Sequence, residues 1–191
     1  MRIAIAGATG VIGQHLVPML TAAGHDVLGM TRSPDLVAGL EAAGAVGTVV
    51  DVYDRERLID VVSAFGPELV MHQLTDLPDD ASDIPSFAAG NARIRSEGTR
   101  NLLAAAAAAG AGRFLAQSIA WTPPVGADVV EQHERMVLEA GGVVLRYGQF
   151  YGPGTYYPAS VPDEPRVHID EAARRTVGLL DAASGVVTVT D

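Results

Sequence analysis

The sequence predicts a doubly wound α/β fold, in which a parallel β-sheet carries helices on both faces. Two observations support this prediction. Short apolar runs alternate with longer stretches of helical periodicity, and the first run leads through the glycine-rich turn GATGVIG (7–13) into such a stretch. Strands and helices that alternate in this way form parallel sheets, because each helix carries the chain back to the same end of the sheet. At 191 residues the chain is long enough for a single domain with its own hydrophobic core.

Apolar runs and the residues that flank them define the expected elements. Strands are predicted at residues 2–6, 26–30, 47–52, 68–72, 113–118, 143–147 and 185–191. Helices are predicted at 10–23, from 34 onward, at 54–65, from 86 through the alanine run at 104–109, at 128–140 and at 170–182. Gly24 is suited to end the first helix, Pro34 to open the second and Asp54 to cap the third. The segment 151–165, rich in glycine, proline and tyrosine, is expected to form a loop.

The composition argues against several classes of protein and partner. The formal net charge is -10, with thirteen arginines and no lysine, so neither nucleic acid nor an anionic membrane is an expected partner. Without cysteine there can be no disulfide, thiolate nucleophile or Cys-ligated zinc. The five histidines show neither HxH nor HExxH spacing, so no metal site is expected. No apolar run is long enough for a signal peptide or a membrane span, which makes a cytoplasmic protein the expectation.

The glycines of GATGVIG have the positions that a dinucleotide site requires. Gly7 ends the first predicted strand, Gly13 falls in the first turn of the next helix, and Gly10 lies where a side chain would keep a phosphate from the helix N-terminus. That terminus offers unpaired N–H groups and a partial positive charge, which suit a diphosphate. The alternative is a tight strand-to-helix turn that binds nothing. The context of strand, turn and helix favours the cofactor site. Its expected contact residues are Gly7, Thr9, Gly10, Val11, Ile12 and Gly13.

Further segments follow this turn in the order found in one protein family. They are DVYD (51–54), ELVMH (68–72), GTRNLLAAA (98–106), RFLAQS (113–118), VVLRYGQFYGPGT (143–155) and VHIDEAA (167–173). Together they resemble the extended and atypical short-chain dehydrogenases, also called the NAD-dependent epimerase/dehydratase family. The resemblance implies one Rossmann-like domain over 1–191, with a dinucleotide-binding core at 1–147 and a truncated substrate-side region at 148–191. It also implies a small-molecule substrate and a homodimer formed through the alanine-rich helix and the 128–140 helix.

The end of the second predicted strand favours NADP(H) over NAD(H). An acidic residue there would bind the ribose 2′-hydroxyl of NAD and repel a 2′-phosphate. This chain has Thr31, Arg32 and Ser33 instead. The arginine can pair with a 2′-phosphate, and the two hydroxyls can donate hydrogen bonds to it. A solvated surface arginine is the alternative interpretation.

The resemblance also assigns the remaining cofactor contacts. It implies that Asp51 and Val52 flank the adenine, and that Gln73, Leu74 and Thr75 line the side of the nicotinamide ribose. Asp51 has a simpler interpretation as an acid that stabilises a turn or caps a helix.

The catalytic pair of the family is absent. Active members carry Tyr-x-x-x-Lys on the helix after the fifth strand, where the lysine lowers the pKa of the tyrosine. This chain has no lysine, and alignment places Gly126 and Val130 at the two positions. Ser118 stands one residue before the position of the family's serine or threonine, which Ile119 occupies.

Three side chains are candidates for the missing catalytic roles: Ser118, Tyr147 and His133. Tyr147 follows the sixth strand near the expected substrate side, with packing of the Gly/Pro-rich loop as the alternative. His133 titrates in a useful range, but a lone histidine flanked by charges in EQHER is typical of a surface position. His168 is expected to order its loop, and Trp121 either walls the substrate pocket or covers the core.

These features favour an NADP(H)-dependent oxidoreductase that acts on a small organic carbonyl or alcohol without the Tyr/Lys pair. Hydride transfer requires cofactor and substrate held in line, and the proton can come from solvent or from the substrate. The missing lysine leaves two alternatives open: a non-catalytic dinucleotide sensor or scaffold, and a non-redox isomerase or cyclase on the same fold. Polar residues retained on the expected ligand side count against a pure scaffold; they are Gln73, Thr75, Asp76, Gln117 and Ser118.

Overall fold

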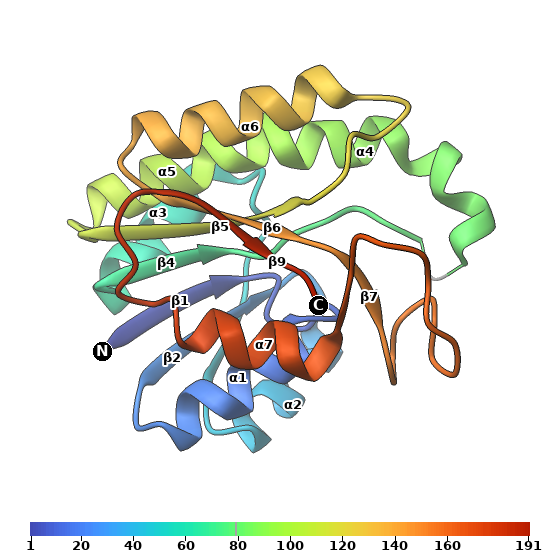
Figure 1. Cartoon of the computed structure of the whole chain (residues 1–191). Helices are drawn as coiled ribbons and strands as arrows, with labels where there is room; N and C mark the ends of the chain where they lie inside the picture. Colours follow the sequence, from blue (N-terminus) through green and yellow to red (C-terminus); the bar gives the residue numbers. More distant parts are fainter. Residues whose placement is uncertain (79) are drawn as a thin grey trace.

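A seven-stranded parallel sheet forms the centre of the protein, as seen in a computed structural model that describes residues 1–78 and 80–191 (Figure 1). Its strands, in the order β3-β2-β1-β4-β5-β6-β9, pair in parallel throughout. Their bounds are β1 (Arg2–Ala6), β2 (Asp26–Thr31), β3 (Val46–Val49), β4 (Leu69–His72), β5 (Arg113–Ile119), β6 (Val143–Tyr147) and β9 (Gly185–Val189). The chain reverses its direction of winding between β1 and β4, and the predicted doubly wound α/β fold is confirmed.

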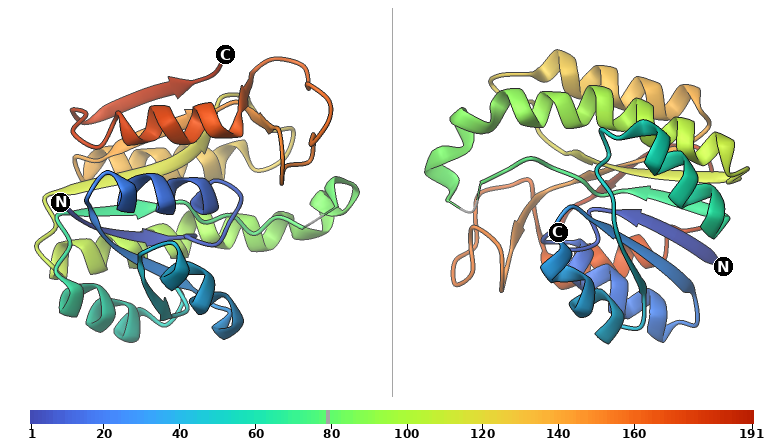
Figure 2. Two further views of the ribbon diagram at one scale, coloured as in Figure 1. Left: turned by 90° about the horizontal axis from the view of Figure 1, so that it is seen from below. Right: turned by 180° about the vertical axis from the view of Figure 1, so that it is seen from behind.

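Helices cover both faces of this sheet (Figures 1 and 2). On one face lie α1 (Gly13–Ala22), α2 (Val37–Ala42) and α7 (Ile169–Val177), and on the other α3 (Arg55–Phe65), α5 (Thr99–Ala108) and α6 (Ala127–Glu139). Successive residues of β1 face opposite layers, so Ile3 and Ile5 pack against α1 whereas Ala4 packs with α3 and α5. Each large side chain buried in these layers contributes about 1.5–3 kcal/mol to stability.

The long helix predicted from residue 86 is built from four consecutive segments. These are the 3₁₀ helix η2 (Ala81–Phe87), α4 (Ala88–Arg93), the π-helical turn η3 (Ile94–Gly98) and α5. Pro85 lies inside η2, where it cannot donate the backbone hydrogen bond that an α-helix requires. The π-helical turn widens the helix where it meets α6, and such turns are frequent at functional sites.

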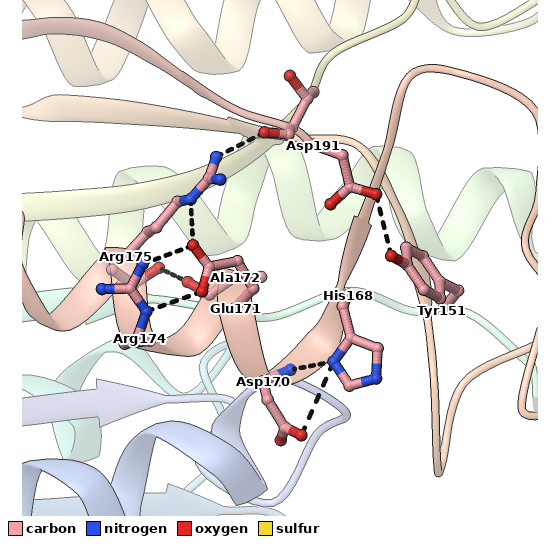
Figure 3. A network of polar contacts seen from close by, with 10 residues as sticks. Tyr151, His168, Asp170, Glu171, Ala172, Arg174, Arg175 and Asp191 are labelled. Atoms are coloured by element: carbon pink, nitrogen blue, oxygen red, sulfur yellow. Dashed lines mark hydrogen bonds and ion pairs between the residues drawn. The ribbon is translucent and has the colours of Figure 1, made fainter.

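The predicted loop 151–165 is confirmed except at Tyr151, and short strands bracket it. β7 (Gln149–Tyr151) and β8 (Arg166–His168) form a separate parallel pair. Strands of three residues carry no periodic signal, and their pairing depends on contacts that are distant in sequence. His168 orders this region as expected: its Nδ1 accepts from the Asp170 amide (3.3 Å) at the start of α7, and its ring meets that of Tyr151 edge-on (Figure 3).

A polar network ties the end of the chain to this pair of strands (Figure 3). The Tyr151 hydroxyl donates to Asp191 Oδ2 (3.0 Å), and the carboxylate of Glu171 on α7 accepts from both Arg174 and Arg175. Those two arginines lower the pKa of Glu171 to about 2, so it is ionised at neutral pH. Arg175 also donates to the Thr190 oxygen, which links α7 to the segment after β9, and the Tyr151 contact links that segment to β7.

Several element ends differ from the predicted ones. α1 begins at Gly13 rather than 10, because residues 7–12 form the preceding turn, and β3 ends at Val49 rather than 52. α7 ends at Val177, before Gly178, rather than at 182. These differences of a few residues do not change the topology, since the order of strands and helices is unaffected.

We expect Gly13→Ala to lower the free energy of unfolding by about 2 kcal/mol or more. A Cβ at Gly13 would overlap the backbone oxygens of Gly7 and Ala8, which cannot move without distorting the turn. Gly39→Ala is the matched control: Gly39 lies in α2 with nothing within 4 Å of its Cβ position. That change should stabilise the protein by up to about 1 kcal/mol. Urea unfolding of both variants measures this, and equal stabilities would contradict the close approach at Gly13.

Candidate functional site

A large cleft of about 1120 Å³ opens at the carboxyl edge of the sheet, beside the point where β1 and β4 diverge. The turn after β1 and the ends of β4, β5 and β6 contribute to its wall. Two segments extend beyond this edge and also line the cleft: η2 with α4, and the segment 148–157 (Figures 1 and 2). Ligands of open α/β sheets bind at this kind of switch point.

The three glycines of GATGVIG have three different structural roles. Gly7 adopts φ +88°, and a Cβ there would come within 2.5 Å of the Gln73 carbonyl oxygen, so only glycine fits this turn. Gly13 lets the helix lie against the turn. At Gly10 the Cβ position has only the Gly7 oxygen within 4 Å, at 3.3 Å, and the residue lines the cleft. A ligand can therefore approach the backbone at Gly10.

The N-terminus of α1 has backbone amides without acceptors in the described part of the chain. Outside the helices and strands, the Gly10 amide donates to the Gly7 oxygen and the Gln14 amide donates to the Gly10 oxygen. Among the described residues, the amides of Val11 and Ile12 donate to no acceptor. Both residues line the cleft, and the first turn of α1 holds no acidic side chain. Free amides at a helix N-terminus stabilise an anion, so the turn has the chemistry of a diphosphate site.

Thr31, Arg32 and Ser33 all line the cleft at the end of β2. The buried Thr31 hydroxyl is engaged in the turn itself: its oxygen accepts from the Ser33 amide (3.2 Å) and lies 3.3 Å from Thr9 Oγ1. The Arg32 side chain is 57% exposed, and its contact with Asp76 is long, at 3.9 Å. The arginine is therefore the more available of these groups for an incoming anion.

The other residues expected around the cofactor divide into two groups. Val52, Gln73, Leu74 and Thr75 line the cleft, whereas Asp51 does not. Asp51 Oδ1 accepts from the Tyr53 amide (2.9 Å), which is the turn-stabilising role of its simpler interpretation.

Gln73 has an unusual environment within this group. Its side chain is buried, and neither amide atom has a hydrogen-bond partner within the described residues. It lies close enough to the Tyr147 hydroxyl to affect the pKa of that group, but not in hydrogen-bonding geometry. Buried amides are rarely left without a partner, so this one marks the wall of the cleft as a ligand-facing surface.

Ser118 lines the cleft but its hydroxyl proton is already committed. Its Oγ donates to Glu134 Oε1 (2.6 Å), and Arg146 binds the same carboxylate through Nε (2.9 Å) and Nη2 (2.6 Å). Burial alone would raise the pKa of Glu134, but the hydrogen bonds from Arg146 and Ser118 outweigh it and hold the pKa below its ordinary value. Because Glu134 is ionised, Ser118 can offer a ligand lone pairs but not its proton.

Tyr147 also lines the cleft, and its environment opposes proton transfer. The side chain is 2% exposed, and its hydroxyl shares a hydrogen bond with Thr176 Oγ1 (2.6 Å). Burial raises the pKa of Tyr147 well above its ordinary value. The tyrosine of a Tyr/Lys pair needs the opposite shift, so Tyr147 does not replace it.

His133 lies in the core rather than at the surface, and it does not line the cleft. The expectation of a surface position is wrong because the charged neighbours in EQHER point to solvent or to Arg146, while His133 faces α5. Because a carbonyl oxygen only accepts, His133 Nε2–H donates to the Gln117 oxygen (3.0 Å). Nδ1 lies 2.8 Å from Thr99 Oγ1, whose single proton also has the Arg95 backbone oxygen within reach (2.7 Å). His72 Nε2 donates to the same hydroxyl oxygen (3.1 Å).

Arg95, a buried arginine of η3 that lines the cleft, is not among the site residues expected from the sequence. A signal for it was present. Arg95 shares the helical positions i, i+4 and i+7 with Thr99 and Leu102, and all three are buried. A charge within such an apolar face has to meet a specific partner or a ligand.

Trp121 lines the cleft with 38% of its surface exposed, which favours the pocket-wall interpretation. Gly126 and Val130, at the positions of the missing Tyr and Lys, line it as well.

Comparison with known proteins agrees with this architecture. Residues 3–139 match the NAD dependent epimerase/dehydratase family, and the chain belongs to that family. It is 38% identical, over an alignment of 235 residues, to a 3-diazoavenalumate denitrifying reductase from Streptomyces sp., with all of this chain and 76% of the relative covered. Because this chain has 191 residues, the relative carries insertions within the aligned range.

Solved structures share the fold at low sequence identity. A UDP-glucose 4-epimerase from Thermotoga maritima, solved with UDP-glucose, superposes with a TM-score of 0.80 at 18% identity, covering all of this chain and 77% of that one. The UDP-glucose 4-epimerase of Thermus thermophilus, solved with NAD, superposes with a TM-score of 0.80 at 20% identity, covering 100% of this chain and 78% of that one. The chain thus has the fold of these enzymes over about three quarters of their length.

Two further findings concern the described residues, 1–78 and 80–191. No group of three or more His, Asp or Glu side chains among them is placed to hold a metal ion. None of their helices combines the length and apolar character needed to cross a membrane.

We expect the free energy of unfolding to decrease as the pH falls from about 6.5 to about 4. Burial, aided by the positive charge of Arg95, lowers the pKa of His133 to about 4, and burial also lowers that of His72. Below pH 6.5 the unfolded chain therefore binds protons at these residues that the folded chain does not, and protonation favours unfolding.

For His133 alone the loss is on the order of 3 kcal/mol across this range. Urea unfolding at several pH values measures it, with His133→Gln as the comparison. Glutamine cannot titrate, so the variant should show a shallower pH dependence; identical slopes would contradict the assignment.

Proposed function

We propose that the chain binds NADP(H) in the cleft and acts as a reductase of a small organic substrate. The observation that carries this proposal is the continuity of the cleft. It joins the free amides at the start of α1 to Ser118 and Tyr147, so one volume has room for a dinucleotide and for a substrate beside it. The name of the 38% identical relative supports a reductive reaction rather than epimerisation.

The preference for NADP(H) rests on Arg32. Its side chain is largely exposed, lines the cleft at the end of β2 and has a long contact with Asp76. A charge-assisted hydrogen bond from Arg32 to a 2′-phosphate contributes about 1.5–3 kcal/mol. Thr31 contributes to the shape of the turn rather than to phosphate binding, because its hydroxyl oxygen already accepts from Ser33.

The protein's part in the reaction is positioning. Bound NADPH would supply a hydride. The Ser118 oxygen, fixed by Glu134, offers lone pairs to a substrate hydrogen-bond donor, and the apolar side chains of the cleft wall exclude water from it. Neither Ser118 nor Tyr147 is arranged to give up a proton. The proton therefore comes from solvent or from the substrate.

A dinucleotide sensor without turnover is the second candidate. It is favoured by Gly126 and Val130, which line the cleft where the family's proton donor and its lysine stand. The polar residues Ser118, Gln117 and Asn91 on the cleft wall favour the reductase, because a sensor needs no substrate-side polar groups.

Turnover distinguishes the two functions. A panel of small carbonyl compounds and other reducible organic acids and esters, incubated with NADPH and followed by its absorbance, should show consumption with at least one member. Tight NADPH binding by calorimetry with no consumption across the panel would favour the sensor. Absence of both NADPH and NADH binding at millimolar concentration would overturn both functions.

Arg32→Ala should weaken NADP⁺ binding by about ten- to a hundred-fold while leaving NAD⁺ binding nearly unchanged. The loss is confined to NADP⁺ because only that nucleotide carries the 2′-phosphate. Calorimetric titration of both nucleotides into both proteins measures it, and NAD⁺ serves as the internal control. Equal losses for the two nucleotides would remove the 2′-phosphate role.

A further inference from the structure

Arg95 is a buried cation in the wall of the cleft. It lies in η3, its residue is 7% exposed, and it lines the same cleft as the glycine turn. Among residues 1–78 and 80–191, its guanidinium donates no hydrogen bond and lies within 4.0 Å of no carboxylate, whereas its backbone oxygen accepts from Thr99. Burying a charge in this way is costly unless something compensates it.

The neighbours of Arg95 leave its charge unbalanced. His72 and His133 lie close enough to feel this charge, and burial keeps both neutral. Glu134 is the carboxylate that acts on Arg95, but it binds Arg146 through two hydrogen bonds and accepts a third from Ser118. Arg95 and Arg146 each carry one positive charge and Glu134 carries one negative charge, so one net positive charge remains beside the cleft. An arginine does not lose its proton in a protein.

The unbalanced charge of Arg95 is separate from the proposed diphosphate site at the glycine turn. The glycine turn opens α1, which packs with Ile3 and Ile5 on one face of the sheet. Arg95 belongs to η3, which continues into α5 and packs against α6 on the opposite face. The glycine turn and Arg95 thus reach the cleft from opposite faces of the sheet, so Arg95 can meet an anionic group other than the one at the start of α1.

We propose that Arg95 binds the carboxylate of the substrate, and that the substrate is therefore an organic acid with an apolar body. The inference rests on the proposed function in that substrate and cofactor share the cleft. The planar guanidinium matches a carboxylate through two parallel hydrogen bonds. A single unbalanced charge suits a monoanion better than a phosphate dianion.

The rest of this part of the wall is apolar. Val129 and Val130 of α6, which packs against η3, line the cleft, as do Trp121 and Pro124. These side chains would contact the body of the substrate while Arg95 holds its charged end.

Benzoate and benzamide test the proposal, since they share a shape and differ in charge. Trp121 is the chain's only tryptophan and lines the cleft, so its fluorescence reports occupancy in the protein loaded with NADP⁺. The wild-type protein should bind benzoate more tightly than benzamide. Arg95→Met should weaken benzoate binding by about ten- to a hundred-fold and leave benzamide unchanged.

Arg93→Met is the matched control. Arg93 lies two residues earlier, is exposed, binds Glu97 (2.7 Å) and does not line the cleft, so its loss should not change benzoate binding. Three results would each overturn the proposal: no saturable benzoate binding to the wild-type protein, equal affinity of the wild-type protein for benzoate and benzamide, or equal benzoate affinity of wild type and Arg95→Met. Phenyl phosphate binding more tightly than benzoate through Arg95 would also overturn it, in favour of a phosphorylated substrate.

Two further measurements distinguish a substrate-binding Arg95 from a structural one and from the cofactor site. If Arg95 were only structural, Arg95→Met would lower the free energy of unfolding; removal of an uncompensated buried charge should instead leave it unchanged or raise it. Calorimetry with NADP⁺ tests the proposed function independently. If the wild-type protein binds NADP⁺ but does not distinguish benzoate from benzamide, only the role of Arg95 is refuted. If the wild-type protein distinguishes the two compounds but does not bind NADP⁺, only the cofactor proposal is refuted.

Discussion

The close approach between the turn after β1 and the end of β4 is the constraint on which the rest of the structure depends. The backbone N–H of Gln73 donates to the Ala6 oxygen (2.8 Å), and there is no room for a Cβ at Gly7 against the Gln73 backbone carbonyl. These two strand ends are held together, but the helices that follow them lie on opposite faces of the sheet: α1 follows β1 on one face, and α5 follows β4 on the other. The cleft is the space between these diverging segments, so it follows from strand order rather than from any single side chain.

The helix α6 shows how one element of this fold supports the site without supplying its chemistry. Its inward side chains, His133 and Glu134, bind the Gln117 backbone on β5 and Arg146 on β6, and so fix the helix against both strands. Its cleft-lining residues are Val129 and Val130, and Gly126 lines the cleft just before the helix begins; none of the three has a polar side chain. The helix therefore holds β5 and β6 in place but supplies no group that could transfer a proton. This arrangement fits the proposed reductase, in which the protein only positions the cofactor and the substrate.

The cleft wall also shows where stability and ligand binding oppose each other. Glu134 is fully satisfied by Ser118 and Arg146, whereas the Arg95 guanidinium and the side-chain amide of Gln73 have no hydrogen-bond partner among the described residues. Unsatisfied polar groups reduce the stability of the ligand-free protein, and they persist in natural proteins where a ligand completes their contacts. Both residues line the same cleft, so their environments are consistent with a site that is completed on binding.

The sequence by itself determined the doubly wound fold and the glycine turn, and most of the cofactor residues that it predicted line the cleft. These depend on local signals: alternating apolar runs, and glycines whose spacing fixes the backbone regardless of distant contacts. Only the tertiary structure decided that His133 is buried, that Asp51 stabilises a turn and that β7 and β8 pair. It also decided that the Arg95 guanidinium meets no carboxylate in the described part of the chain. The physical reason is that a side chain's protonation state and partners depend on what packs against it from distant parts of the chain, and the residues around His133 and Arg95 come from β4, β5, α5 and α6.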